Sequence, residues 1–491
     1  MTVPQPPAPP GTAPNNGRAA PHGRWRRPIG RGLAAAGAVA TGAALAVLVA
    51  QPDAVAPSLT GPTRAVAFVG AAWLVFALGG WQVRRLPVRT ATVLILLGGA
   101  VLPLAAGSAP PRSSDDMYRY IWDGRVQAAN IDPYRYVPAA PELADQRDDF
   151  LWPVGAHWCV PADAVDPDHG RPLAPGCTLI NRPTVHTVYP PAAQAIFAAV
   201  YLVWPSGRQA PLQRTMAGFA LATTILLLIG LRVMRADPRM AVLWAWCPTV
   251  ALEAGNNAHV DVAAAFLTGL ALLVLARAGT RRASILGGAL LGLAVATKLT
   301  PLLVTPAVLR RRPVLVATAI AGAVALVYLP HVLAVGAEVV GYIPGYLNEE
   351  GYASGGRFAL LTLFMPTAWA APVAVAVLAA VALRAVRTAD PDQPWLAATT
   401  VTGAALIIAA PTYPWYALLL ILLVALGGRT EWLAVAAAAY LAQYGPNLHL
   451  TTESAQRIGY AAALVTVVTV AVLRRRRTTT PSAAHPLGVD T

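Results

Sequence analysis

Two adjacent carboxylates, Asp115 and Asp116, open a long polar segment in a chain that is otherwise strongly apolar. They follow an apolar stretch by only a few residues, so we expect them near a membrane surface. Partial removal from water raises the pKa of a carboxylate, which suits it to act as a general base near neutral pH. The pair could instead bind a divalent cation, or cap the helix expected to begin at Met117. These roles remain open, and the sequence firmly implies no cofactor.

Three more ionisable residues, Glu253, His259 and Asp261, interrupt another apolar stretch, with Asn257 between them. Polar groups at such a depth in a membrane are unfavourable and usually line a cavity. We therefore favour a functional cluster here over a simple turn. Zinc is the weaker interpretation, because no second group of Cys or His residues accompanies this one at the spacing of metal ligands.

Two isolated cations lie in the second half of the chain. Lys298 is the only lysine, since the other 36 basic residues are all arginine. A lone intramembrane lysine suggests a point-charge partner such as a phosphate, although it could also be a residue that snorkels from the end of a span. Arg357 belongs to the glycine-rich segment 351–358, where backbone amides could approach an anion.

The elements that must position these residues are apolar helices. Hydrophobic residues make up 56% of the chain and charged residues only 12%, about half the charged share of a typical soluble domain. We therefore predict an all-α polytopic membrane protein with about 12–14 transmembrane helices. The short runs 284–297 and 299–309 could form a helical hairpin within the bundle. The expected spans lie at about 33–51, 65–83, 89–107, 212–232, 240–254, 259–276, 284–297, 299–309, 313–333, 359–383, 395–411, 414–428, 431–445 and 457–473.

Arginine clusters at the ends of the apolar runs indicate the orientation of the chain. The net charge is +14, but no polar domain gathers the basic residues as in a nucleic-acid-binding protein. Clusters of this kind mark the cytoplasmic side of a membrane protein. We predict a multi-pass protein of the inner (plasma) membrane with both termini in the cytoplasm. The short run 190–205 would reverse this orientation if it crossed, so we expect a re-entrant or surface-lying helix there. The clusters are Arg24–Arg27, Arg84–Arg85, Arg281–Arg282, Arg310–Arg312 and Arg474–Arg477.

This topology divides the chain into a disordered cytoplasmic tail at 1–30, a transmembrane domain at 31–473 and a basic cytoplasmic tail at 474–491. It places the loop 108–188 outside, with 11 of the 23 acidic residues of the chain. The aromatic segment Tyr118–Trp122 in this loop is typical of an interfacial helix. Cys159 and Cys177 in the same loop could form a disulfide or remain free thiols.

Several of these motifs together resemble the GT-C glycosyltransferases, and among them the actinobacterial polyprenol-phosphate-mannose-dependent α-mannosyltransferases. The motifs are Asp115–Arg125, Asn130–Tyr134, Tyr189–Gln194, Gly255–Asp261 and Lys298–Pro301. The resemblance implies a membrane enzyme that takes a hexose from a polyprenyl-phosphate donor and transfers it, with inversion, to a glycan or glycolipid of the cell envelope. It implies an active site on the extracytoplasmic side, in contact with the lipid bilayer, and no nucleic-acid partner.

The resemblance also implies roles for individual residues. An acidic residue of the first large external loop acts as the base in this superfamily, and Asp115 stands at the expected place with Asp116 beside it. We expect the donor phosphate to be bound by His259, Lys298 and Arg357, and no metal site. The expected substrate-binding residues are Tyr118, Arg119, Arg125, Tyr189, Asn257 and Asp261.

Two other functions remain open from the sequence. The same class of enzyme could transfer arabinose or glucose, because no residue pattern encodes the stereochemistry of the sugar. A transporter or flippase for a lipid-linked sugar is the alternative from another class. It would place acids and the lone lysine along a central path, whereas here the polar residues gather on one predicted face.

Overall fold

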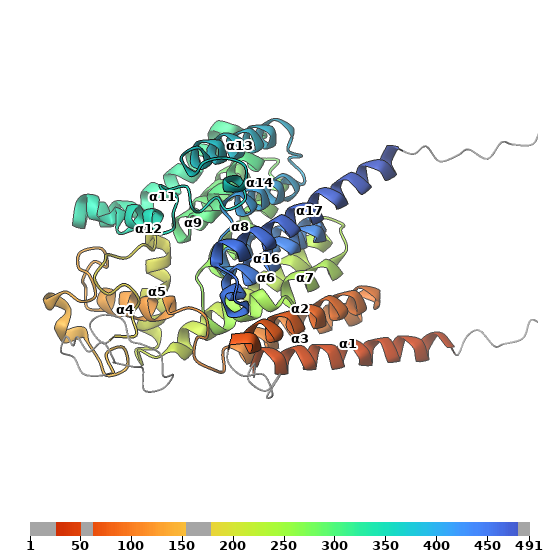
Figure 1. Cartoon of the computed structure of the whole chain (residues 1–491), viewed down its shortest axis with the longest axis horizontal. Coiled ribbons are helices and arrows are strands. Elements are labelled where there is room, and N and C mark those ends of the chain that lie inside the picture. The colour runs from red at the N-terminus through yellow and green to blue at the C-terminus, as the bar shows by residue number, and fades with distance from the viewer. Residues whose placement is uncertain (1–25, 51–61, 154–177, 480–491) are drawn as a thin grey trace, which may run out of the picture.

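The computed structural model describes residues 26–50, 62–153 and 178–479, and these residues form helices joined by turns, without a β-sheet (Figure 1). Most of the expected N-terminal tail, the last twelve residues, and both Cys159 and Cys177 lie outside the described ranges. The expected boundary at 473 is not a structural break, because the last helix continues through the arginine cluster to Thr479.

Most helices follow the apolar runs of the sequence. The span expected at 299–309 was wrong, because this run forms a 3-10 turn, Thr300–Val304, and a helix of only four residues. The bounds of the helices are α1 Arg26–Ala50, α2 Pro62–Arg85, α3 Val88–Ala106, α4 Asp116–Ala128, α5 Pro191–Val203, α6 Gln209–Val233, α7 Val242–Ala245, α8 Asp261–Ala276, α9 Arg281–Thr297, α10 Thr305–Val308, α11 Pro313–Val335, α12 Ile343–Glu349, α13 Thr367–Thr388, α14 Pro394–Ala409, α15 Leu418–Gly427, α16 Leu433–Tyr444 and α17 Thr452–Thr479.

The all-α polytopic prediction is confirmed. Among the described residues, seven helical segments are long and apolar enough to cross a membrane, or up to eight if one bent pair counts as a span. The further helices expected as spans include α9, α14, α15 and α16, which have 17, 16, 10 and 12 residues. A straight span needs about 20 residues. The expected number of 12–14 is therefore reached only when these shorter helices are counted as well.

The prediction of one straight span at 240–254 was wrong. Helix α7 covers only four residues, and a π-helical turn, Val250–Asn256, follows it. Pro248 lies between them and has no N–H to continue a helical hydrogen-bond ladder. The chain then bends by 119° from the π-helical turn into α8. The break leaves Glu253, Asn257 and His259 next to one another at an end of the bundle.

Helix α5 occupies the run at 190–205 for which a re-entrant or surface-lying helix was predicted. It has 13 residues and is therefore about 20 Å long, less than the roughly 30 Å of a bilayer core. It begins at Pro191, in the first turn, where the missing N–H of proline has no consequence. Leu202, Val203 and Trp204 at its end are exposed.

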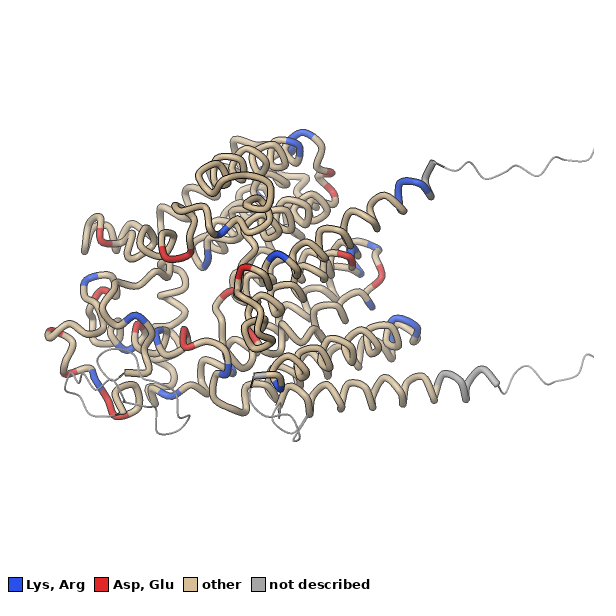
Figure 2. Tube along the Cα trace, in the orientation of Figure 1, with Lys and Arg blue, Asp and Glu red and all other residues tan. Residues whose placement is uncertain are grey.

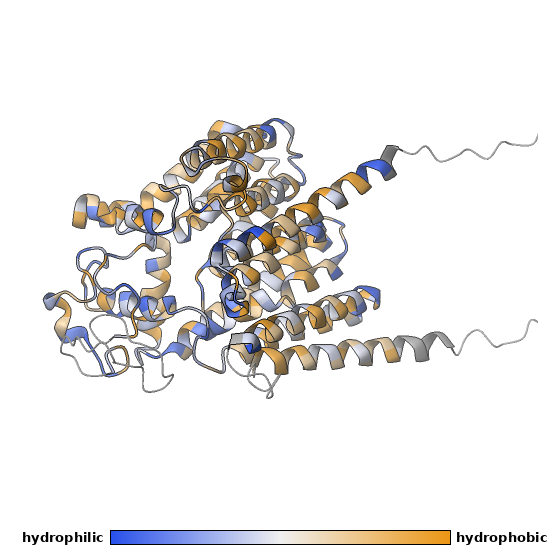
Figure 3. Cartoon of the chain, in the orientation of Figure 1, coloured by the Kyte–Doolittle hydropathy of each residue, from blue (hydrophilic) through white to orange (hydrophobic). Residues whose placement is uncertain are grey.

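The helix ends form two groups at opposite ends of the bundle. We call one the Asp116 end; it comprises the residues 107–115, helix α4, the turn 257–260, Lys298 and the turn 410–417, which contact one another. The other, the arginine end, carries the clusters at 84–85, 281–282, 310–312 and 474–476. Figure 2 shows basic residues at helix ends on the side where the two termini leave the bundle, and Figure 3 shows the apolar helices between the two ends.

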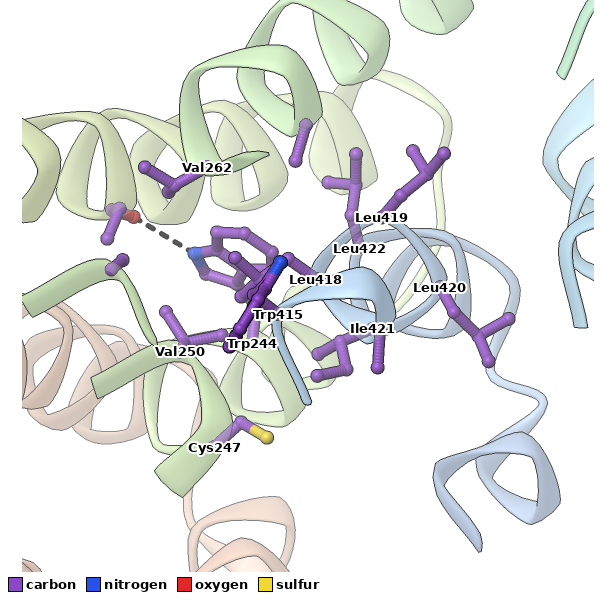
Figure 4. Packing of buried hydrophobic residues seen from close by; sticks show 14 of the residues in the cluster. Trp244, Cys247, Val250, Val262, Trp415, Leu418, Leu419, Leu420, Ile421 and Leu422 are labelled. Carbon is purple, nitrogen blue, oxygen red and sulfur yellow. Dashed lines mark hydrogen bonds between the residues drawn. The ribbon is translucent and has the colours of Figure 1, made fainter. Parts of the chain in front are cut away.

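The core of the bundle lies where α6, α7, α8 and α15 meet (Figure 4). Residues Leu418–Val424 of α15 are at most 4% exposed, although a helix that is apolar all round could equally face lipid. The indole of Trp244 is fully buried and donates a hydrogen bond to the carbonyl of Ala220 at 2.9 Å. Trp415 belongs to the same buried cluster, and it connects this core with the Asp116 end.

Candidate active site

A cavity of about 410 Å³ lies at the Asp116 end of the bundle. Five of the residues predicted for the site line it, and they come from three segments that are far apart in the sequence. Carboxylates, cations and aromatic rings thus share one partly enclosed space, as expected of a site for a charged, ring-containing ligand. The five residues are Asp115, Asp116, Arg119, Tyr189 and Lys298.

Asp116 is the first residue of α4, and its carboxylate is held from one side. Asn181 donates a hydrogen bond to Oδ1 at 2.7 Å, while Oδ2 lies 3.7 Å from Nδ1 of His259. The side chain is 17% exposed. Asp115 occupies the N-cap position, but its side chain makes no cap hydrogen bond. Helix capping, one of the roles left open above, is therefore not what the Asp115 side chain does.

His259 lies between two carboxylates. Its Nδ1 is 3.7 Å from Asp116 and its Nε2 is 3.6 Å from Oε2 of Glu253. The ring is fully buried and stacks on Trp415 with 3.9 Å between ring centroids. Neither ring nitrogen has a hydrogen-bond partner among the described residues. The imidazole therefore packs between the two acids without a direct hydrogen bond to either of them.

Asn257 does not line the cavity, but it forms hydrogen bonds with residues next to it. Its amide donates to Oγ of Ser113 at 2.6 Å and to Glu253 at 2.9 Å, and its carbonyl accepts the backbone N–H groups of Arg112 and Ser113. Tyr440 donates to the second oxygen of Glu253 at 2.9 Å. These hydrogen bonds fix the segment that leads into α4, and so the position of Asp116.

Lys298 directly follows α9 and extends into the cavity with 16% of its side chain exposed. Its ammonium lies 3.1 Å from Oδ2 of the buried Asp261, and 5.3 Å from the centre of the Tyr189 ring. Asp261 therefore holds the lysine in place and compensates part of its charge. Such a cation, fixed at a cavity wall, can stabilise negative charge that develops on a ligand.

Tyr189 contributes a neutral hydroxyl to the same wall. Burial, followed by the nearby charge of Asp116, raises the pKa of this phenol well above its usual range. The group therefore keeps its proton at any physiological pH and can donate a hydrogen bond to a ligand.

Three of the predicted residues lie elsewhere. Arg357 is buried against the carboxylate of Glu350, and Arg125 pairs with Asp148. The ring of Tyr118 packs edge-on against Phe150, with 5.9 Å between ring centroids. None of the three lines the cavity.

The sequence analysis missed several residues that do line the cavity. Asn181 and Arg182 come from a segment without a clear motif, and Arg182 forms an ion pair with Glu349 of α12 at 2.9 Å. Tyr413, Trp415 and Tyr416 lie in the turn before α15. The density of aromatic residues in this turn was the available signal, but it fits an interfacial turn equally well.

The middle of the chain matches a known family. The model of glycosyltransferase family 87 matches residues 187–411, a little under half of the chain. The match supports a membrane glycosyltransferase. It also supports the resemblance to the GT-C superfamily, and the matched range includes Tyr189, His259, Asp261 and Lys298. Asp115 and Asp116 precede it.

The other comparisons add little. A search of the curated proteins finds no match. Among solved structures, the chain is similar to the oligosaccharyltransferase of Archaeoglobus fulgidus tethered to an acceptor peptide, at 13% identity and a TM-score of 0.30. The similar part covers 78% of this chain and 50% of that one.

Proposed function

We propose that the protein transfers a mannosyl group from a polyprenyl-phosphate donor to a glycan or glycolipid acceptor of the cell envelope. The observation that carries the proposal is the cavity at the Asp116 end, which is lined by a carboxylate that Asn181 orients and by a lysine that Asp261 holds in place. An acid and a cation in one cavity are what transfer of a sugar from a phosphate requires. The family match to the adjoining residues supports the same class of reaction.

The reaction is a displacement with inversion. The carboxylate of Asp116 takes the proton of an acceptor hydroxyl, and the hydroxyl oxygen forms a bond to the anomeric carbon. The bond from that carbon to the phosphate oxygen breaks on the opposite face, and its electron pair leaves with the polyprenyl phosphate. Lys298 stabilises the charge that develops on the phosphate.

We assign the base to Asp116 because its surroundings orient it. Asn181 fixes one carboxylate oxygen, which leaves the other facing His259 and the cavity. Asp115, which lines the same cavity, provides the natural comparison.

The arginine end lies on the cytoplasmic side in this proposal, because basic clusters are retained there. The cavity then opens outside, in the inner (plasma) membrane of the cell, where both a lipid-linked donor and an envelope acceptor are within reach. Labelling of engineered cysteines at Ser114 and at Arg282 in intact cells tests this orientation, with only the former expected to react with an impermeant reagent.

The decisive experiment measures sugar transfer by the purified protein in lipid nanodiscs. Polyprenyl-phosphate mannose, glucose and arabinose are compared as donors with a panel of glycan and glycolipid acceptors. We expect Asp116→Asn to lower the rate about 10²–10⁴-fold, the usual contribution of a general base. Asp115→Asn, the matched control, should retain most of the rate. Full transfer by both single variants and the double variant would overturn the mechanism, and preference for another donor would overturn mannose.

A further inference from the structure

A second cavity, of about 670 Å³, lies at the arginine end of the bundle, far from Asp116. Residues of α2, of α16 and of the 3-10 turn before α7 line it. The mechanism proposed above uses none of its residues. Its walls combine two chemistries, apolar along the helices and cationic at their ends.

The apolar wall is one continuous stripe of α2. Trp73, Phe76, Ala77, Gly80, Trp81 and Arg84 all line the cavity, and they recur every three or four residues, the spacing of one helix face. From Trp73 to Arg84 the helix rises by about 16 Å at 1.5 Å per residue. This is close to half of the roughly 30 Å hydrocarbon core, the depth of a single leaflet.

The part of the wall on α16 keeps the cavity open. Helix α16 presents Leu433, Ala434 and Ala437 to it, of which two are alanines with little side-chain volume. The ring of Trp81 is 51% exposed, although an indole of this size would normally be covered in a packed interior. The space between the helices is therefore suited to a flexible apolar chain.

The charges gather where the stripe ends. Arg84, Arg85 and Arg239 line this part of the cavity together with a single carboxylate, Asp237. Arg239 donates through Nε to both oxygens of Asp237, at 2.9 and 3.0 Å. The guanidinium of Arg85 lies 3.7 Å from the centre of the Trp81 ring. Three cations facing one anion leave a net positive charge at the mouth of an apolar slot.

We propose that this cavity binds an anionic phospholipid of the surrounding leaflet. One acyl chain lies along the stripe from Trp73 to Trp81, and the phosphate lies among Arg84, Arg85 and Arg239. Guanidinium groups suit this role, because their planar donors match phosphate oxygens. The length of the stripe favours a lipid over a free phosphate, which would use the arginines and leave the apolar wall empty.

Lipid binding to the full-length protein is measured by native mass spectrometry from detergent. The probes are dioleoyl phosphatidylglycerol, dioleoyl phosphatidylcholine with the same chains, and glycerol phosphate with none. We expect phosphatidylglycerol to bind at least about tenfold more tightly than phosphatidylcholine, since each arginine near a membrane surface contributes about fivefold to the binding of an anionic lipid. Equal binding of the two lipids contradicts the proposal.

Two variants separate a built site from a merely basic surface. Arg84→Gln combined with Arg85→Gln removes two cations of the cavity, and should weaken phosphatidylglycerol binding more than tenfold. Its matched control is Arg281→Gln combined with Arg282→Gln, an exposed adjacent pair of the same end that does not line the cavity. Equal losses in the two double variants would show that lipid is attracted only by the overall positive charge of the arginine end. That result would overturn the proposed site.

A third variant tests the apolar wall while keeping every charge. Ala437→Leu fills part of the cavity that the α2 stripe lines and should weaken phosphatidylglycerol binding without changing that of glycerol phosphate. If Ala437→Leu has no effect and glycerol phosphate binds as tightly as the lipid, the site is one for a free anion and the proposal fails. Unchanged melting temperatures and sugar transfer confirm that the variants are folded.

Discussion

Asp116 and Asp123 lie seven residues apart on one helix, α4, and their carboxylates have opposite surroundings. Asp123 is 1% exposed, and donors of the protein occupy both of its oxygens. Arg119 donates to Oδ1 at 2.8 Å, while Thr187 and Gln194 donate to Oδ2 at 2.7 and 2.8 Å. Asp116 faces a cavity, and Asn181 donates a hydrogen bond to its Oδ1.

The difference separates a structural carboxylate from a candidate base. A carboxylate whose acceptor positions are filled by fixed donors has little capacity left for the proton of a ligand. The network of Asp123 instead ties α4 to α5, since Gln194 belongs to α5 and also accepts from Gln127 of α4 at 2.9 Å. This rigid pair of helices then presents Asp116, at the start of α4, to the cavity.

The largest stability effect is expected from the buried acid. Asp123→Asn removes the charge that pairs with Arg119 and puts an amide N–H₂ in place of one carboxylate oxygen, so that at least one of the three donors around it loses its acceptor. Breaking a buried ion pair by removing one partner costs about 3–5 kcal/mol, so we expect a clear fall in melting temperature, measured by differential scanning fluorimetry in detergent. The matched change, Asp116→Asn, should leave the melting temperature the same or slightly higher, because functional carboxylates rarely stabilise a fold.

Reversal of this pattern would contradict the comparison. If Asp116→Asn unfolds the protein while Asp123→Asn leaves it intact, the acid at the cavity is the structural one. Transfer rates of Asp123→Asn are then to be compared per folded molecule, so that a loss of fold is not counted as a loss of chemistry.

The features that could be predicted from sequence were those that differ in polarity from the residues around them. Acids and a single lysine are conspicuous in an apolar chain, so Asp115, Asp116 and Lys298 could be singled out, and the structure brings all three to one cavity. Most helix positions could be predicted for the same reason, because apolar runs and the prolines between them mark beginnings and ends. Pro248 shows the limit: a single proline interrupts an apolar run, and hydropathy alone overlooked the break.

Which charged or polar side chains pair with one another in space could not be predicted. Arg357 and Arg125 were expected to contact substrate, but in the structure Glu350 and Asp148 accept them as partners. An arginine is available to a ligand only if no carboxylate lies nearby in space, and the sequence does not give that distance. Asn181 was missed for the converse reason, since its role depends on the position of Asp116 across the loop.

The next largest effect is expected at the lysine. Lys298→Gln removes the positive charge at the cavity wall and leaves Asp261 buried without its partner. We expect the transfer rate to fall by about 10²–10³-fold, as for loss of a group that stabilises charge in a transition state. Lys298→Arg, which keeps the charge in a different shape, should retain more of the rate. A normal rate in Lys298→Gln would indicate that the lysine only snorkels from the end of α9.

The smallest effect comes from a pair of changes that each remove one donor from one aspartate. Asn181→Ala deletes the hydrogen bond to Asp116, whose net value is about 1.5–3 kcal/mol for a charged acceptor and less at this partly exposed position. We therefore expect about a tenfold loss of transfer with little change in melting temperature. Thr187→Val deletes one of the donors to Asp123, and with it the oxygen that accepts from Gln194 and from the backbone N–H of Tyr189. It should lower the melting temperature by a few degrees, while the rate per folded molecule changes less than in Asn181→Ala. Measured side by side, the two variants should affect different properties; a shared loss of rate and stability would show that the two aspartates belong to one network and that the distinction between them is wrong.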